Sequence, residues 1–325
     1  MIKLGNQGAL VSRVGFGCMG MSDFYNAKSG RQESVETIRM ALDSGINFLN
    51  TGDFYGMGDN ELLIAEALKG RSDKAFISVK FGALRSPDGA FVGFDARPQA
   101  VKNFISYSLV RLNVDVIDLY QPARVDTSVP IEETVGAISE LIKDGKVKYL
   151  GLSEVNSEQL RRAHKVHPVT AVEVEYSLAT RVLEKDLLNT ARELGVSIVP
   201  YGVISKGLLT DKLDTNYPDG DYRKYLPRFT GDNLENNKKV VAPLMELAKE
   251  KNCTPAQLAI AWVLHRGDDI VPLIATSKKS RLTENLKALE IKLTEQEVKY
   301  LSDAFPEGTF LGDRYDSHQM ASVLK

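Results

Sequence analysis

The sequence is poor in cysteine, with only Cys18 and Cys253 in 325 residues. Two cysteines so far apart do not indicate a disulfide framework, so a reducing compartment, the cytoplasm, is the simpler prediction. Long apolar runs are also missing, because none reaches the roughly 18 residues that a membrane-spanning helix needs. The first ten residues, MIKLGNQGAL, lack the apolar core of a signal peptide. We therefore expect a cytoplasmic protein with no membrane partner.

Neither sign of charge dominates the chain. Lysine and arginine number 41 against 43 aspartates and glutamates, and no long basic run occurs. Nucleic acid is therefore not an expected partner. The length and a hydrophobic fraction of 43% suit one large α/β domain or two small ones. Because no low-complexity stretch or linker interrupts the chain, residues 1–325 are predicted to form one domain, whose oligomeric state the sequence does not indicate.

Short apolar runs alternate along the chain with amphipathic helical patterns, several of which end at a glycine suited to a helix C-cap. Eight such units predict a closed parallel (β/α)8 barrel. The alternative is a doubly wound open sheet, but its glycine-rich phosphate turn is missing, since GFGCMG (15–20) has another spacing and no helix after it. The predicted strands span 14–18, 46–50, 75–80, 116–120, 149–154, 171–176, 197–202 and 270–275.

Three segments do not fit the simple repeat. Residues 2–12 read as a short hairpin that closes the bottom of the barrel. Residues 210–233 form a long polar, aromatic-rich loop after the seventh strand, and an irregular tail follows Phe305. In a barrel, that loop and tail can both reach the carboxyl ends of the strands, where active sites lie.

A tyrosine and a lysine stand near the ends of two neighbouring predicted strands. Tyr55 follows the second strand, and Lys80 ends the third. Because parallel strands end at one face, the two side chains are expected to meet there, with Asn50 and Asp53 beside them. An ammonium next to a phenol favours the phenolate, which lowers the pKa of a tyrosine from about 10 toward the range of a general acid. The pair predicts a proton donor and the residue that tunes it.

A second signal is electrostatic and follows the eighth strand. ATSKKSRLTENLKAL (275–289) begins a helix that Thr276 or Ser277 could cap, yet three cations occupy its first turn. Cations at a helix N-terminus oppose the macrodipole, unless the helix end binds an anion such as phosphate. We therefore predict a phosphate site. His164 and His167 share a helical face, but no carboxylate or cysteine pattern supports a metal there.

The chain resembles the aldo-keto reductase family over almost its full length. The family implies a (β/α)8 barrel that binds NADPH and reduces aldehydes or ketones by hydride transfer. Its proton donor is a tyrosine supported by a lysine, an aspartate and a histidine. The stretches that carry the resemblance are LVSRVGFGCMGM (10–21), NTGDFYGMGDNE (50–61), SVKFG (78–82), VIDLYQPARVD (116–126), GKVKYLGLSE (145–154), EYSL (175–178), IVPYGVISKGLL (198–209) and ATSKKSRLTEN (275–285).

Carried over position by position, the resemblance makes Tyr55 the proton donor and Lys80 its lysine. The family's aspartate falls at Asn50 and its histidine at Ala123, so two of the four positions depart. Most cofactor positions are kept, although glutamates replace two carboxamide partners of the nicotinamide, at 154 and 173. The implied cofactor residues are Ser153, Glu173, Tyr201, Ser205, Lys206, Gly207, Leu208, Thr276, Lys278, Arg281, Glu284 and Asn285.

Two interpretations remain open at this point. The first is an NADPH-dependent oxidoreductase that acts on a small carbonyl substrate, with Tyr55 tuned by Lys80. Losing a donor at Ala123 would cost such an enzyme on the order of 10²–10³ in rate. Asp53 could replace the missing carboxylate, although capping the next turn is its simpler role. The second is a regulatory protein that binds NADPH and has lost efficient catalysis.

Overall fold

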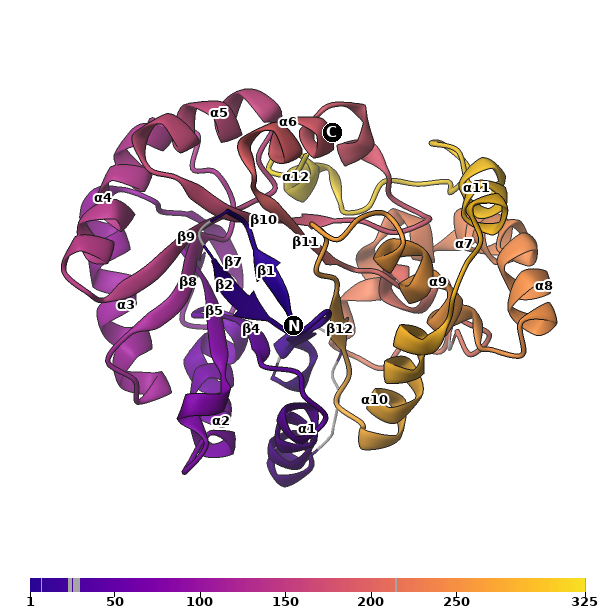
Figure 1. Ribbon diagram of the computed structural model, residues 1–325, viewed down its shortest axis with the longest axis horizontal. Helices are drawn as coiled ribbons and strands as arrows, with labels where there is room; N and C mark the ends of the chain where they lie inside the picture. The colour runs from indigo at the N-terminus through magenta and orange to yellow at the C-terminus, as the bar shows by residue number, and fades with distance from the viewer. Residues whose placement is uncertain (7, 23–24, 26–29, 214, 325) are drawn as a thin grey trace.

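The computed structural model describes residues 1–6, 8–22, 25, 30–213 and 215–324. Eight strands pair in parallel in the order β11-β10-β9-β8-β5-β4-β3-β12. The two edge strands meet as well, because the Ile198 amide donates to the Asp269 carbonyl at 2.9 Å and the Val271 amide donates to the Ile198 carbonyl at 2.8 Å. The sheet is thus a closed barrel, as the sequence predicted, and the open-sheet alternative is wrong (Figure 1).

The start and end of each barrel strand lie within a few residues of the predicted bounds. β5 and β10 are buried along their whole length, which explains why their sequences are nearly continuous apolar runs rather than alternating ones. The strands are β3 (Gly15–Gly17), β4 (Phe48–Gly52), β5 (Phe76–Phe81), β8 (Ile117–Pro122), β9 (Val147–Ser153), β10 (Val169–Glu175), β11 (Ser197–Tyr201) and β12 (Leu273–Ala275).

Helices surround the barrel and cover the outer faces of its strands (Figure 1). Gly45, Gly145 and Gly195 have positive φ just past the ends of three of them, as the C-cap prediction requires. None of the helices among the described residues is long and apolar enough to cross a membrane. They are α1 (Arg31–Asp43), α2 (Asp59–Ala67), α3 (Pro98–Leu112), α4 (Ile131–Lys143), α5 (Ser157–Val166), α6 (Leu187–Leu194), α7 (Gly231–Val240), α8 (Ala242–Glu250), α9 (Pro255–Leu264), α10 (Lys279–Leu286), α11 (Glu295–Ala304) and α12 (Ser317–Met320).

The predicted N-terminal hairpin is present, with β1 (Ile2–Leu4) antiparallel to β2 (Ala9–Val11). It lies across the barrel end at which the strands begin, and Figure 1 shows it in indigo over the centre of the molecule. Leu4 and Val11 are fully buried there. The turn approaches the barrel closely, because a side chain on Gly5, at φ +60°, would meet the Thr170 carbonyl oxygen at 2.4 Å. The hairpin therefore closes the bottom and leaves chemistry to the opposite end.

The carboxyl end of the barrel is covered by irregular segments. One is a hairpin that the sequence did not reveal, β6 (Ala83–Arg85) paired with β7 (Phe91–Phe94), directly after β5. The predicted loop 210–233 contains two short 3₁₀ turns, at Tyr222–Tyr225 and Pro227–Phe229, before α7 begins at Gly231. The C-terminal tail also returns to this end, as its contacts show below.

Candidate active site

Four of the barrel strands each send a polar side chain into the carboxyl end of the barrel. Asn50 lies on β4, Lys80 on β5, Gln121 on β8 and Glu173 on β10, and all four are buried. The strand register places Lys80 beside Gln121, and it places Ser153 of β9 beside Glu173. Because the barrel is closed, these side chains lie close together in its interior, although Asn50 and Glu173 are 123 positions apart in the chain. Asn50 and Lys80 meet as the sequence predicted.

Tyr55 lies on a 3₁₀ turn that starts three residues after β4. The two residues that follow it, Gly56 and Met57, both have φ of 55°. This left-handed path folds the turn back over the barrel end. The Tyr55 ring is buried, and its centroid lies 5.4 Å from the Lys80 Nζ. The predicted pair of proton donor and lysine is therefore assembled.

Lys80 has a carboxylate partner that the sequence did not reveal. Its Nζ lies 3.0 Å from Glu173 Oε1 and 3.2 Å from Oε2, and it also donates to Asn50 Oδ1 at 2.6 Å. Glu173 Oε2 accepts two further hydrogen bonds, from Asn50 Nδ2 at 2.8 Å and Gln121 Nε2 at 2.6 Å. A signal was present, because the run AVEVEY places glutamates inside a buried strand, where a charge needs a partner.

The ionisation of Lys80 depends on this pair. Burial has the largest effect and holds the pKa of Lys80 below its usual value, and Arg124 lowers it further. The charge and hydrogen bonds of Glu173 oppose this lowering, as does the charge of Cys18 when its thiol is ionised. Cys18 is itself fully buried, and burial raises the pKa of its thiol to about 12. At neutral pH Cys18 is therefore uncharged, and Glu173 is the anion that balances Lys80.

Asp53 does not replace the missing aspartate. Burial and the nearby Glu61 raise the pKa of Asp53 to about 8, against the opposing effect of Arg111 and two backbone amides. Asp53 is therefore mostly protonated at neutral pH and supplies little negative charge. Its backbone amide donates to the Lys80 carbonyl at 2.9 Å, which ties the Tyr55 turn to β5.

The position of the family's histidine is filled by a small side chain. Ala123 is buried and offers no polar group, so nothing at this position can donate to a substrate oxygen. The neighbouring Arg124 turns back, and its Nη1 donates to the Ala123 carbonyl at 2.6 Å and to Ser153 Oγ at 3.4 Å. The site therefore has a cation beside the space that the alanine leaves.

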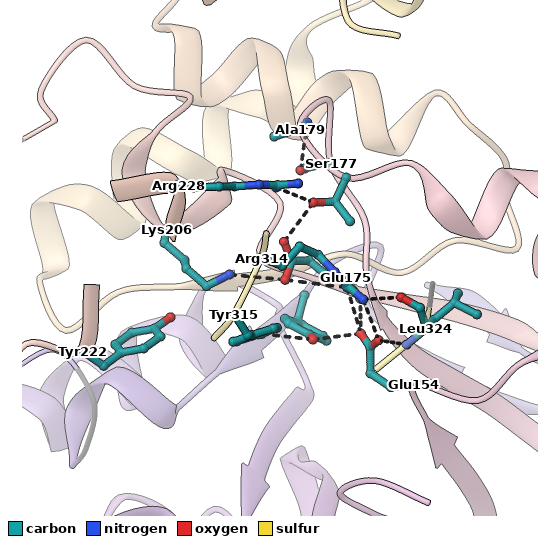
Figure 2. A network of polar contacts seen from close by, with 12 residues as sticks. Glu154, Glu175, Ser177, Ala179, Lys206, Tyr222, Arg228, Arg314, Tyr315 and Leu324 are labelled. Atoms are coloured by element: carbon teal, nitrogen blue, oxygen red, sulfur yellow. Dashed lines mark hydrogen bonds and ion pairs between the residues drawn. The ribbon is translucent and has the colours of Figure 1, made fainter. Parts of the chain in front are cut away.

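The C-terminal tail is tied to the carboxyl end by a buried ionic network, which Figure 2 shows at close range. Glu154 accepts hydrogen bonds from the Leu324 amide at 2.8 Å and from Arg314 Nη2 at 3.3 Å. The Tyr201 hydroxyl donates to Glu154 at 2.8 Å and lies 3.1 Å from the Tyr315 hydroxyl. Tyr201 and Glu154, both at predicted nicotinamide positions, are thus in contact with the tail. The sequence placed the tail at this face but did not name Arg314 as its anchor.

The predicted pyrophosphate loop lies beside the same network. Ser205 and Lys206 both have positive φ, and Lys206 Nζ pairs with Glu175 Oε2 at 3.2 Å, 4.7 Å from the Tyr315 ring centroid. Burial alone would raise the pKa of Glu175, but Lys206 and two arginines lower it to about 2. This carboxylate is therefore charged throughout the physiological range, and it holds Lys206 at the barrel end.

The predicted 2′-phosphate residues form a separate cluster at the start of α10. The helix begins at Lys279 with Lys278 as its N-cap, so the prediction that Thr276 or Ser277 caps it is wrong. Thr276 Oγ1 instead accepts a hydrogen bond from the Lys278 amide, and no side chain caps the helix. Arg281 is exposed there. A helix end with uncapped amides and exposed cations suits an anion.

The fold and the site together define a class: a (β/α)8-barrel enzyme with a tyrosine over a buried lysine–glutamate pair at the carboxyl end. The sequence profile of the Aldo/keto reductase family matches residues 13–305 of the chain. The chain therefore belongs to the aldo/keto reductase family, and the protein is an NAD(P)H-dependent oxidoreductase.

Individual relatives agree with this assignment. The chain is 44% identical over 316 residues to a probable aldo-keto reductase 1 of Glycine max, covering 97% of this chain and 91% of the relative. Among solved structures, the glycerol dehydrogenase of Gluconobacter oxydans is similar with a TM-score of 0.84 and 28% identity, over 94% of both chains. An aldo/keto reductase of Klebsiella pneumoniae, solved with NADP and acetate, has a TM-score of 0.74 at 22% identity, over 97% of this chain and 98% of its own, and supports the fold.

Proposed function

We propose that the protein reduces an aldehyde or ketone to the alcohol, reversibly, with NADPH as the hydride donor and Tyr55 as the proton donor. When bound, NADPH supplies the hydride that reaches the carbonyl carbon. Tyr55 gives its phenolic proton to the carbonyl oxygen, and in the oxidative direction it takes that proton back. The observation that carries the proposal is the Tyr55 ring over the buried Lys80–Glu173 pair.

Two sets of residues fit the cofactor. The uncapped start of α10, with Lys278 and Arg281, suits the 2′-phosphate, together with Thr276, Glu284 and Asn285. For the reacting end we assign Tyr201 and Ser153 to the nicotinamide, and the turn 205–208, which carries the cation Lys206, to the pyrophosphate. The two free cysteines support a reducing compartment, the cytoplasm, as the place of action.

Single-turnover oxidation of bound NADPH by a panel of aldehydes and ketones tests the proton donor. Replacing Tyr55 with phenylalanine should slow turnover by roughly 10²–10⁴-fold, the usual contribution of general acid catalysis, with NADPH binding unchanged. Tyr107→Phe, an exposed tyrosine on α3, is the matched control and should turn over like wild type. A Tyr55→Phe variant as active as wild type would remove Tyr55 from the mechanism.

A second measurement tests the cofactor assignment. Arg281→Ala should weaken NADPH binding by about tenfold or more and leave NADH nearly unaffected, because only NADPH carries the 2′-phosphate. Lys287→Ala is the control, since it removes a positive charge at the opposite end of the same helix and should leave the binding of both cofactors unchanged. Equal losses for both cofactors would place the phosphate elsewhere.

The alternative function, NADPH binding without efficient catalysis, has its own supporting observation. Ala123 cannot supply the hydrogen bond that a histidine at this position would donate, and the tail contacts Tyr201, which is predicted to hold the nicotinamide. Tight NADPH binding without turnover in either wild type or Tyr55→Phe would favour this regulatory interpretation.

A further inference from the structure

We propose that Glu173 is a positioning residue for the reduction, which holds the Lys80 ammonium charged and in place beneath Tyr55. The role rests on the proposed function, since Lys80 matters there only as the partner of the proton donor. It differs from the sequence-based expectation, in which Glu173 contacts the cofactor.

The first support is that Glu173 is the only carboxylate within ion-pair distance of Lys80 among the residues described. Its two oxygens lie 3.0 and 3.2 Å from the Lys80 Nζ, and both side chains are about 95% buried (4% and 5% exposed). A buried ammonium without a counter-charge would lose its proton, because desolvation disfavours the charged form. The neighbouring Asn50 contacts the same ammonium but carries no charge.

The second support is that the Glu173 carboxylate is fixed in this orientation. Oε2 accepts hydrogen bonds from Lys80, Asn50 and Gln121, all of which donate, as an ionised carboxylate requires. The Gln121 amide faces Glu173 although its own oxygen is buried without a hydrogen-bond partner. The surroundings of Glu173 are therefore arranged for an anion that points at Lys80.

The third support comes from the other groups that face Lys80. Cys18 follows β3, Tyr55 lies on the turn after β4, and Arg124 follows β8. Arg124 is a like charge and opposes the ammonium, while Cys18 is uncharged at neutral pH because burial raises its pKa. Within the described part of the chain, no other element that contacts Lys80 brings a fixed negative charge, so removing Glu173 leaves the repulsion of the ammonium by Arg124 without a counterweight.

The geometry allows the carboxylate to be moved rather than merely removed. Asn50 Oδ1 lies 2.6 Å from the Lys80 Nζ, so an aspartate at position 50 would bring a carboxylate to the same ammonium from strand β4. Glu173→Gln should lower kcat by roughly 10–100-fold at neutral pH and shift the pH profile of kcat. The double variant Asn50→Asp with Glu173→Gln should recover most of the activity and the original profile, since it restores one carboxylate and one amide.

Three measurements on Glu173→Gln separate this role from others: NADPH affinity, the urea midpoint and the pH profile of kcat. If Glu173 acted through the cofactor, Glu173→Gln would weaken NADPH binding and Asn50→Asp would not rescue it. If the loss were structural, urea midpoints would fall in step with activity. The control is Glu184→Gln, which breaks a half-buried pair with Arg181 away from Lys80 and should leave the pH profile unchanged.

A measurement without turnover keeps this proposal distinct from the proposed function. The ¹³Cε chemical shift of Lys80, assigned by comparison with Lys80→Met, reports its charge in free enzyme. It should titrate at lower pH in Glu173→Gln and return in the double variant. If wild type reduces no carbonyl but this pattern holds, the proposed function fails while the pairing stands. An unchanged titration in Glu173→Gln, or no recovery in the double variant, would overturn the inference.

Discussion

At the scale of single residues, Asp53 is a buried carboxyl whose Oδ2 atom has no hydrogen-bond partner. Its pKa of about 8 is far above the value of about 3.9 for an aspartate in an unfolded chain. Between these two values the folded protein keeps a proton that the unfolded chain has released. Folding is then linked to proton uptake, so the free energy of unfolding falls as pH rises from about 4 to about 8.

This linkage predicts a pH-dependent effect of Asp53→Asn. The amide keeps the size of the protonated carboxyl and cannot ionise, so the variant should gain stability relative to wild type as pH rises. We expect the gain to grow by on the order of 1–3 kcal/mol between pH 5 and pH 8.5. Urea unfolding of both proteins at the two pH values measures it. A difference that stays constant with pH would contradict the raised pKa.

The sequence predicted part of this site for a physical reason. Tyr55, Lys80 and Asn50 follow or end neighbouring strands, so the parallel fold alone brings them together. Glu173 lies 93 residues beyond Lys80 and reaches it only because the barrel closes across its interior. That contact depends on the strand register, which periodicity does not specify. The position-by-position resemblance assigned Glu173 to the cofactor, which stays a prediction, and gave no indication of its contact with Lys80.

At the scale of elements, the C-terminal tail is joined to the barrel mainly through Arg314. This side chain is 4% exposed and donates to Glu154 and to the Leu324 carbonyl, 3.8 Å from Glu175 Oε2. Removing one partner of a buried ion pair typically costs about 3–5 kcal/mol, because the remaining charge loses its counterion. The tail should therefore depend on Arg314 more than the barrel does.

Arg314→Met should release the tail and leave the strands intact. We expect hydrogen exchange at the Leu324 amide and across α12 to accelerate by at least about tenfold, while amides of β9 and β10 stay protected. Exchange measured by mass spectrometry checks this. Lys299→Met is the control, because the exposed Lys299–Asp303 pair contributes about 0–1 kcal/mol and its loss should change little. Unaltered exchange in the tail would mean that other contacts hold it.

The elements differ in how well the sequence indicated them. The eight barrel strands were found because each is an apolar run buried on both faces. The β6–β7 hairpin was missed because its strands are short, with three and four residues that are mostly half-buried and show no clear alternation. The start of α10 was misplaced because Thr276 and Ser277 have N-cap preferences, whereas Thr276 accepts its hydrogen bond from the amide of Lys278, one residue before the helix begins.

At the scale of the whole molecule, the closed sheet makes the barrel one structural unit. Trp262 is the only tryptophan in the sequence and is fully buried on α9. It packs against Tyr176, which follows β10, and its Nε1 donates to Ser302 of α11 at 3.1 Å. Its fluorescence therefore reports on packing that joins distant parts of the chain.

If residues 1–325 fold as a single domain, unfolding should be one cooperative transition. Tryptophan fluorescence, which follows the surroundings of α9, and far-ultraviolet circular dichroism, which follows all helices and strands, should then give the same urea midpoint. Two separated midpoints would divide the chain into independently stable parts.

The two free thiols carry a practical consequence for watching this barrel open. Cys253 is half-buried, whereas Cys18, directly after β3, is fully buried, and burial raises the pKa of its thiol to about 12. Alkylating reagents attack the thiolate, so Cys18 should react only in molecules that have transiently exposed it. Cys253 should be labelled first. The rate at which mass spectrometry then detects a second label, on Cys18, reports how often the barrel opens beside Lys80. Labelling of Cys18 can therefore measure this opening without an engineered cysteine.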